Sequence, residues 1–501
     1  MKPLRKMNRE EREFFSMVAH AAFANPFSTE RMELDRKVTG VTRADLTREE
    51  MVQQVTVKVA ERLRILEAFG RADLSLYQGE ERRTVGVVFL FTAYHRFRNE
   101  FDAFIPKQVA AGDAPCKIPF ARDVLAMLAH LGFTEAEALK YFALFYQFRR
   151  AFYFIESGLA GASSTMHRLR LNLWNNVFTN SLDLYDTHLW DRMEDFSTLL
   201  LGETGTGKGA AAAAIGRSCF IPYDPVKNQF VESFTRNFIS LNLSQYPETL
   251  IESELFGHRK GAFTGAVENY EGIFSRCTSH GSIFLDEIGD ISIPVQIKLL
   301  QVLQERTFSA VGSHDRLRFH GRVIAATNRP LDEMRRRGQF RDDFYYRLCS
   351  DTIVVPSLRE RITEEPRELE VMVNHLLTRM VGESRQGLVD LVLTTLKRDL
   401  PPEYPWPGNV RELEQAVRRI LLAGRYEGDS SLQGEAVEAK RMKEGTVDAY
   451  TLLVNYCRHL FAIYGTYEEV ARRTRLDRRT VKKYLQDGAP DPGSSTSLAG
   501  R

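Results

Sequence analysis

Residues 197–209, STLLLGETGTGKG, decide the fold of the middle of this chain. An apolar run leads directly into a glycine-rich turn, and the alanine-rich stretch AAAAAIG at 210–216 follows it. A strand, a glycine loop and a helix N-terminus in this order direct backbone N–H groups and the positive end of a helix dipole at one anion. The spacing G-x-x-x-x-G-K fits a phosphate-binding loop, although a glycine-rich turn with one lysine can also be purely structural. The residues expected to bind the phosphates are Gly202, Glu203, Thr204, Gly205, Thr206, Gly207, Lys208 and Gly209.

Two acidic residues, Asp286 and Glu287, directly follow the apolar run SIFL at 282–285. They stand at the carboxyl end of an expected strand, which is where open α/β sheets bind ligands. Such a pair can be a solvated turn, but behind a phosphate loop we expect it to be catalytic. Asp286 would hold Mg²⁺, and Glu287 would polarise the water that attacks ATP. Gly209 stands where the general pattern has a hydroxyl for the metal.

Length and composition indicate several ordinary packed domains. The 501 residues leave room for about three domains. A net charge of only +2 indicates that any nucleic-acid surface must be a local patch. The longest apolar runs, such as VGVVFLF at 85–91, are shorter than the roughly twenty residues that span a bilayer, and the charged N-terminus is unlike a signal peptide. The sequence therefore predicts a cytoplasmic protein without a membrane partner, and its five scattered cysteines are expected to be reduced thiols.

An aromatic stripe marks the expected N-terminal helices. In YFALFYQFRRAFYFI at 141–155, apolar residues recur at steps of four, three, four and three, so that they share one helical face. Core packing is the expected role of such a stripe, and a ligand pocket or a subunit interface is the alternative. The stripe consists of Tyr141, Phe145, Phe148, Phe152 and Ile155.

Between the two nucleotide motifs lies ESELFGHRKGAFTGA at 252–266, which contains an intact GAFTGA. With this segment, roughly residues 160–425 resemble the NtrC-like bacterial enhancer-binding proteins, which are AAA+ ATPases that activate the sigma-54 form of RNA polymerase. The resemblance implies that this glycine-hinged loop contacts sigma-54 with Phe263 and Thr264 at its tip, whereas the spacing alone also fits a buried β-turn. Arg259 stands where relatives commonly have an acid, which is expected to alter loop contacts. The loop residues expected to contact sigma-54 are Gly261, Ala262, Phe263, Thr264, Gly265 and Ala266.

The resemblance also implies roles for residues outside these motifs. Asn242 in FISLNLS would hold Glu287 until ATP rearranges the site, and Thr327 with Asn328 would read the γ-phosphate as sensor I. Two arginine fingers in FRDDFYYRL would reach the neighbouring subunit's site, which requires a ring of subunits, expected to be a hexamer. The lid segment WPGNVREL at 406–413 would place one further arginine over the nucleotide. These three arginines are Arg341, Arg347 and Arg411.

The C-terminal segment TYEEVARRTRLDRRTVKKYL at 466–485 has two helix starts in close order. Thr466 with Glu469 fits a capping box, and Asp477 fits the N-cap of a second helix after a short turn. Seven basic residues and one acid lie between 472 and 483, so a helix-turn-helix that binds double-stranded DNA is expected, in the position where relatives have a Fis-type domain. The residues expected to contact DNA are Arg475, Arg478, Arg479, Thr480, Lys482 and Lys483.

The sequence thus predicts a multidomain protein with an α/β core. We expect a helical N-terminal regulatory domain of unknown type at 1–160, an AAA+ α/β subdomain at 161–357, and a helical lid at 358–425. A linker at 426–445, a helix-turn-helix domain at 446–487 and a disordered tail at 488–501 follow.

The expected function is that of a sigma-54-dependent activator, which binds upstream enhancer-like DNA and uses ATP and Mg²⁺ to convert the closed polymerase complex into the open one. Two alternatives remain at this point. One is a DNA-binding regulator that does not use ATP, and the other is an AAA+ remodeller of a substrate unrelated to transcription.

Overall fold

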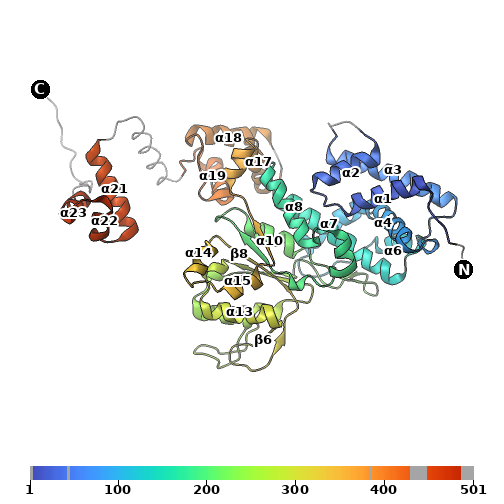
Figure 1. The fold of residues 1–501 in the computed structure, drawn as a ribbon, viewed down its shortest axis with the longest axis horizontal. Helices are drawn as coiled ribbons and strands as arrows, with labels where there is room; N and C mark the ends of the chain where they lie inside the picture. Colours follow the sequence, from blue (N-terminus) through green and yellow to red (C-terminus); the bar gives the residue numbers. More distant parts are fainter. Residues whose placement is uncertain (1–3, 42–45, 384, 429–447, 487–501) are drawn as a thin grey trace. The chain divides into compact units, whose positions relative to one another are not determined.

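The computed structural model describes residues 4–41, 46–383, 385–428 and 448–486 (Figure 1). They belong to two compact units, Met1–Thr394 with Glu403–Leu422, and Thr395–Pro402 with Ala423–Arg501. Most of the predicted linker at 426–445 and all of the predicted disordered tail at 488–501 lie outside the described residues. The predicted domain boundaries stay predictions.

A five-stranded parallel sheet lies at the centre of the first unit, with the strand order β4-β5-β8-β1-β9. The apolar runs at 197–201 and 282–285, which were predicted to be strands, form β1 and β5. β8 is buried along its whole length, as expected for a strand covered by helices on both faces. The strands are β1 (Thr198–Leu201), β4 (Phe238–Asn242), β5 (Ser282–Asp286), β8 (Arg322–Thr327) and β9 (Asp351–Val354).

Alternate side chains of the sheet pack into two apolar layers, because successive residues of a strand point to opposite faces. Ile324 of β8 packs in the layer that contains the alanine-rich α10 (Lys208–Gly216), whereas its neighbour Val323 packs in the layer that contains α13 (Ile293–Glu305). Two short antiparallel hairpins complete the strands, β2 (Tyr223–Asp224) with β3 (Gln229–Phe230) and β6 (Thr307–Phe308) with β7 (Leu317–Arg318). The predicted AAA+ domain is therefore a helix–sheet–helix sandwich.

Further helices surround this sheet and form the lid. The helices of the α/β part are α11 (Glu248–Phe256), α12 (Ile273–Arg276), α14 (Leu331–Arg336) and α15 (Asp342–Leu348), with single 3-10 turns η4 (Leu243–Gln245) and η5 (Ile288–Asp290). The lid helices are α16 (Leu358–Glu364), α17 (Glu368–Val381), α18 (Gln386–Asp399) and α19 (Asn409–Ala423).

The N-terminal region is helical, as predicted. Its elements are α1 (Arg9–Phe23), α2 (Thr29–Thr39), α3 (Arg48–Ala68), η1 (Leu74–Leu76), α4 (Gly79–Arg96), α5 (Arg98–Ala111), α6 (Ala121–His130), α7 (Glu135–Gly158), α8 (Ser164–Phe178), α9 (Leu182–Leu184), η2 (Tyr185–Leu189) and η3 (Met193–Asp195).

Helix α7 joins these N-terminal helices to the nucleotide-binding part. Its Tyr146 stacks on Phe230 with ring centroids 4.0 Å apart. The fully buried Arg150 donates hydrogen bonds to the carbonyls of Arg217 and Cys219, at 2.8 and 2.7 Å. These carbonyls follow the C-terminal end of α10, where a cation favourably opposes the helix dipole. The phosphate-loop helix is thus held directly by an N-terminal helix, and one continuous apolar core includes both.

The aromatic stripe of α7 packs in the core of the N-terminal region and also borders a cavity. Phe145 and Ile155 are buried, but Tyr141, Phe148 and Phe152 are only partly buried. Tyr141, Phe145, Phe148 and Phe152 line a cavity of about 640 Å³ inside the N-terminal region. The prediction of core packing is confirmed, since Phe145 and Ile155 belong to the buried core and Tyr141, Phe148 and Phe152 pack against it. The same helical face also borders a space that the facing helices α2, α3 and α4 leave open.

The second unit contains three short helices, α21 (Ala449–Tyr464), α22 (Tyr467–Thr474) and α23 (Arg478–Gln486), which pack around a small core of Cys457, Leu460, Val470 and Val481. Among the described residues, no helix is long and apolar enough to cross a membrane.

Candidate active site

The glycine-rich turn lies between β1 and α10 in the predicted strand–loop–helix order. Gly205 has φ +80°, and a Cβ there would lie 2.2 Å from the carbonyl oxygen of Gly408 in the lid, so only glycine fits. Lys208 begins α10, and its Nζ donates to the carbonyls of Gly202 and Glu203 at 2.8 and 3.1 Å. Burial lowers the pKa of Lys208, although the nearby Glu287 and Asp286 oppose this effect.

The two acids lie beside this lysine at the carboxyl end of β5. Burial raises the pKa of Asp286, and Lys208 partly offsets the shift. Burial and the negative charge of Asp286 raise the pKa of Glu287. Glu287 has a left-handed backbone conformation, with φ 56° and ψ 47°, and its Oε2 is buried without a hydrogen-bond partner. A strained residue with an unpaired carboxylate oxygen is typical of a functional position rather than a structural one.

Asn242 contacts a different acid from the one predicted. Its Nδ2 donates to Oδ2 of Asp286 at 3.4 Å, while its Oδ1 accepts from the backbone N–H and the hydroxyl of Ser244. The reason is strand register, because β4 pairs with β5 such that Asn242 lies directly opposite Asp286. Among the described residues, no hydrogen bond joins Asn242 to Glu287.

The sensor residues lie at the end of β8, one strand away from the acids. Thr327 is fully buried, and its hydroxyl oxygen accepts a hydrogen bond from the backbone N–H of Arg329 at 3.0 Å. The Nδ2 of Asn328 donates to the hydroxyl of Thr204 at 2.9 Å. Asn328 therefore contacts the phosphate loop, whereas Thr327 supports the turn that carries it.

A cavity of about 360 Å³ opens over the phosphate loop. The sequence-predicted residues that line it are Thr204, Gly205, Thr206, Gly207, Lys208, Gly209, Asp286, Glu287 and Arg411. Its other walls were not predicted. They come from Gly158 at the end of α7 with the following Leu159 and Ala160, from Met166 and Leu169 of α8, from Ala210 of α10, and from the lid residues Arg361, Met372, His375, Leu376, Arg379, Val410 and Glu414.

Two lid residues hold the lid against the phosphate loop. Asn409 is fully buried, and its Nδ2 donates to Oε2 of Glu203 and to the carbonyl of Thr204, both at 3.1 Å. Arg359 forms a bidentate pair with Glu203, with one contact at 3.0 Å. Asn409 lies inside the predicted sensor II segment, but only the fold shows that it points back at the loop.

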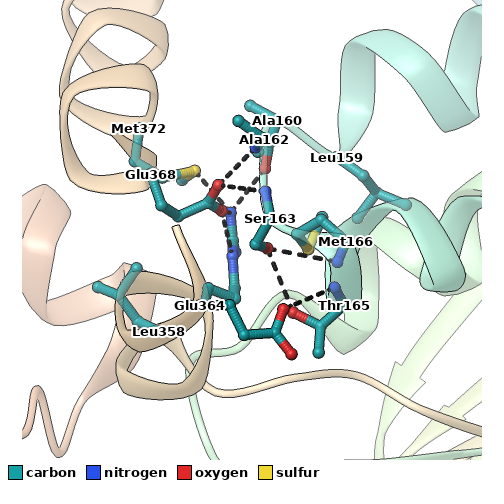
Figure 2. A network of polar contacts seen from close by, with 12 residues as sticks. Leu159, Ala160, Ala162, Ser163, Thr165, Met166, Leu358, Glu364, Glu368 and Met372 are labelled. Carbon is teal, nitrogen blue, oxygen red and sulfur yellow. Dashed lines mark hydrogen bonds and ion pairs between the residues drawn. The ribbon is translucent and has the colours of Figure 1, made fainter. Parts of the chain in front are cut away.

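The segment between α7 and α8 is fastened to the lid by a buried ion pair (Figure 2). Nε of Arg361 donates to Oε1 of Glu368 at 2.6 Å, and Nη2 of Arg361 donates to the carbonyl of Ala160 at 2.7 Å. Oε2 of Glu368 accepts from the backbone N–H groups of Ala162 and Ser163, the latter at 2.9 Å. We call Ala160, Ala162, Ser163, Arg361 and Glu368 the interdomain latch. Sequence reasoning missed it because its two sides lie about 200 residues apart.

Neither predicted arginine finger lines the nucleotide cavity of its own chain, as far as the described residues show. Arg341 is paired with Asp343 on the surface at 2.7 Å, and Arg347 donates to the carbonyl of Leu303 at 2.9 and 2.8 Å. Their predicted role concerns a neighbouring subunit and stays a prediction.

The GAFTGA segment forms a closed turn, in which the N–H of Gly261 donates to the carbonyl of Ala266 at 2.8 Å. Phe263 is half-buried with its ring edge-on to His258, at 4.9 Å between centroids, and Thr264 is exposed. Arg259 forms an ion pair with Asp315 at 3.1 Å, so the residue that departs from the family pattern ties this loop to the β6–β7 hairpin region. Phe263 is therefore less exposed than a tip residue is expected to be.

The C-terminal helices carry exposed basic side chains on α23 and on the preceding turn. Asp477 caps α23 as predicted, by accepting from the N–H groups of Arg479 and Thr480 at 2.8 and 3.1 Å. The predicted capping box at Thr466 is wrong, because the Thr466 side chain caps nothing and Glu469 is paired with arginines of its own helix. Thr480 is half-buried, and its hydroxyl donates to Asp477. The exposed basic residues are Arg475, Arg478, Arg479, Lys482 and Lys483.

Comparison with known proteins agrees with this geometry. Residues 186–354 match the family model of the Sigma-54 interaction domain. The regulatory protein AtoC of Escherichia coli is 36% identical over 252 residues, which cover 50% of each chain. The transcriptional regulatory protein ZraR of Salmonella typhimurium is 41% identical over 240 residues, covering 48% of this chain and 50% of the relative. The chain thus spans about half the length of these relatives.

Among solved structures, NtrX of Brucella abortus in complex with ATP is 19% identical, covers 73% of this chain and 79% of that chain, and has a TM-score of 0.41, too low to support an argument. The family model and the named regulators are the basis for the assignment. Residues 186–354 therefore form a Sigma-54 interaction domain, and over about half of its length the chain is similar to regulators such as AtoC, ZraR and NtrC.

Proposed function

We propose that this protein hydrolyses ATP in an AAA+ ring, binds DNA upstream of promoters, and remodels the closed complex of sigma-54 RNA polymerase into the open complex. The observation that carries the proposal is the convergence of Lys208, Asp286, Glu287 and Asn328 around one phosphate loop, in the domain that also holds an intact GAFTGA turn.

ATP fits the cavity chemically. The loop amides and Lys208 suit an anionic phosphate chain, and Arg411 contributes a further positive charge from the lid. Asp286 would hold Mg²⁺, which usually takes only one or two carboxylates besides phosphate oxygens and water. The metal, when bound, neutralises charge on the phosphates. A missing hydroxyl at Gly209 is compatible with this, because Asp286 supplies the protein ligand.

Glu287 is the residue we assign to the attacking water. Its buried, unpartnered Oε2 is available to accept a hydrogen bond from that water. The water oxygen bonds to the γ-phosphorus as the bond to the β-phosphate oxygen breaks, which releases ADP and phosphate. Thr327 and Asn328 lie at the carboxyl end of the neighbouring strand β8. Loss of the γ-phosphate would therefore change the conformation of the turn that follows β8.

A ring explains the positions of Arg341 and Arg347 outside their own site. Arginine supplied by a neighbouring subunit contributes roughly 10³ to 10⁵ in rate by stabilising transition-state charge. We therefore assign both to the adjacent protomer's site, and we infer a hexamer. The GAFTGA turn would unfold from His258 when nucleotide binds and present Phe263 and Thr264 to sigma-54.

DNA binding is assigned to α22 and α23. A helix with five exposed basic side chains on and just before it, behind a short turn, suits the major groove and its flanking phosphates. Because the Thr480 hydroxyl already donates to the capping residue Asp477, we assign base contacts mainly to Arg478 and Arg479.

Steady-state ATPase assays test the enzymatic part. Glu287→Gln should lower kcat by roughly 10² to 10⁴, the usual contribution of a positioned acid–base group, and Lys208→Ala should weaken ATP binding. Unchanged turnover in both variants would contradict the proposal. Thr264→Ala should keep ATPase activity but lose retention of sigma-54 with a transition-state mimic, while Thr378→Ala on an exposed lid position serves as the control.

Footprinting tests the DNA-binding part separately. Arg479→Ala should weaken protection of the specific site and leave basal ATPase unchanged. Arg472→Ala is the matched control, since Arg472 is exposed on α22 but is paired with Glu469 at 2.6 Å. Equal protection by the Arg479 variant and the wild type would refute the assignment of α23.

A further inference from the structure

We propose that the cavity in the N-terminal region binds a small effector with an aromatic body and one negative charge. The cavity measures about 640 Å³ and is lined by residues of α2, α3, α4, α7 and α8. Cavities of roughly 300 to 1,000 Å³ are the usual size of small-molecule sites. A well-packed domain interior contains few voids larger than a water molecule, so a space of this size is unusual unless a ligand occupies it.

The walls suit a flat apolar ligand. Phe145 and Phe148 of the α7 stripe face the cavity together with Phe91 and Tyr94 of α4 and Trp174 of α8. Several of these rings already contact one another edge-on, as between Tyr94 and Phe145 at 5.5 Å. Aromatic rings prefer such edge-to-face or offset contacts, so further aromatic surface can be added to this set.

The charged residues of the lining are nearly all in pairs. Each acid has a basic partner among the described residues, either in the lining or directly behind it. These pairs are Arg31–Asp35, Arg82–Glu137, Arg83–Asp183, Arg98–Glu49, Lys140–Asp186 and Arg170–Glu156. Arg149 is held by Asp102 from behind the cavity, in a bidentate pair at 2.6 and 2.8 Å.

Arg48 is the lining cation left without an ion pair or a hydrogen bond to another described residue. Its guanidinium lies over the rings of Phe27 and Phe152, 5.0 and 4.9 Å from their centroids. Burial lowers the pKa of Arg48. Glu156 is the acid that most opposes this shift, but its carboxylate is paired with Arg170 at 3.8 Å. A planar guanidinium held on two aromatic faces, with its N–H groups unpaired among the described residues, is well suited to one carboxylate or sulfonate.

His95 adds a polar group to the same cavity. Burial, followed by the positive charges of Arg31, Arg98 and Arg149, holds the pKa of His95 well below its ordinary value. Its ring is therefore neutral at neutral pH, and it packs 4.2 Å from Phe91. Arg48 is thus the single lining arginine that no acid pairs with among the described residues, which is why we infer a ligand with one negative charge rather than two.

The cavity is connected to the nucleotide site through α7. One face of α7 lines the cavity, and Arg150 on another face caps the end of the phosphate-loop helix α10. An effector that orders α7 would therefore change how α10 is held. This regulatory consequence rests on the proposed ATPase function, whereas ligand binding itself does not.

Two fluorescent probes of the same skeleton test the binding site on the full-length protein. The anion 8-anilinonaphthalene-1-sulfonate should bind more tightly than its neutral analogue N-phenyl-1-naphthylamine. Arg48→Gln should raise the Kd of the anionic probe about tenfold or more, the effect expected for loss of a charge-assisted hydrogen bond, and should leave the Kd of the neutral probe nearly unchanged. Arg64→Gln is the control, since Arg64 is exposed on the same helix α3 and does not line the cavity.

A second variant locates the probe. Leu90 lines the cavity and is only partly buried, so Leu90→Trp should fill part of the space and weaken both probes, with folding checked by circular dichroism. Equal binding of the two probes, or equal effects of the Arg48 and Arg64 substitutions, would overturn the proposed anion selectivity. If neither of the two probes bound, the proposed binding site itself would be overturned. ATPase activity is recorded with and without the anionic probe, so that a failed ATPase assay and a failed binding assay remain distinguishable.

Discussion

Replacing Glu368 by alanine should open the interdomain latch. The Glu368 side chain is completely buried, and it accepts hydrogen bonds from Arg361 and from two backbone N–H groups, those of Ala162 and Ser163. Alanine would leave a buried guanidinium without its partner and two buried donors without an acceptor. Removing one member of a buried ion pair costs about 3–5 kcal/mol.

This loss of free energy should destabilise mainly the segment between α7 and α8, because the latch holds that one short segment against the lid. Hydrogen exchange followed by mass spectrometry on the peptide 159–166 measures the opening directly. A loss of 3–5 kcal/mol corresponds to an exchange rate raised by roughly 10² to 10³ or more. Since Ala160 also lines the nucleotide cavity, ATP affinity should fall in the same variant.

Glu364→Ala is the matched control. Glu364 is the last residue of α16, lies four residues before Glu368 in the sequence, and is exposed. It accepts from the hydroxyl of Ser164 and the N–H of Thr165 at 2.8 and 2.9 Å. Loss of such an exposed cap costs only about 1 kcal/mol. If peptide 159–166 exchanged equally in the Glu364 and Glu368 variants, the reasoning about the buried pair would be refuted.

Three further predictions concern single residues. Gly209→Ala should raise stability by roughly 0.5–1 kcal/mol, the helical preference of alanine over glycine, because a Cβ there meets nothing nearer than Phe284 at 4.0 Å; thermal unfolding measures this, and a lower midpoint would contradict it. Burial raises the pKa of the Cys277 thiol to about 12, so its thiolate fraction at pH 8 is about 10⁻⁴. Alkylation of Cys277 should therefore be slow and should accelerate as the pH rises, and rapid labelling at pH 8 would be inconsistent with this environment. Because Glu287 must be ionised to polarise water and its pKa is raised by burial and by Asp286, ATPase activity should fall on acidification at a higher pH than the ordinary glutamate value of about 4.3; a pH–rate profile with its acidic inflection at or below that value would refute the shift.

The nucleotide-binding part could be predicted because its signals are local. A strand, a glycine turn and Lys208 follow one another within thirteen residues, and the acids directly follow an apolar run. Local order of this kind fixes the backbone shape before any tertiary contact is considered.

The remaining features depend on contacts between distant segments. Asn242 was expected to hold Glu287, but the register between β4 and β5 places it opposite Asp286. Glu469 was expected to cap its helix, but two arginines on the same helix compete for its carboxylate. Periodicity showed that Phe148 shares a face with its neighbours, but it could not show whether the opposing helices fill the space in front of that face.

Helix α7 both lines the N-terminal cavity and holds α10, and this has a consequence for the design of truncated versions of the protein. A fragment that begins at residue 161 would lose Phe142 and Tyr146, and with them the rings that cover Phe230 and Tyr223. Large uncovered apolar patches promote aggregation. A truncated version of the protein should therefore begin before Thr134, whose side chain caps the N-terminus of α7. The aromatic surface around Phe230 and Tyr223 then stays buried.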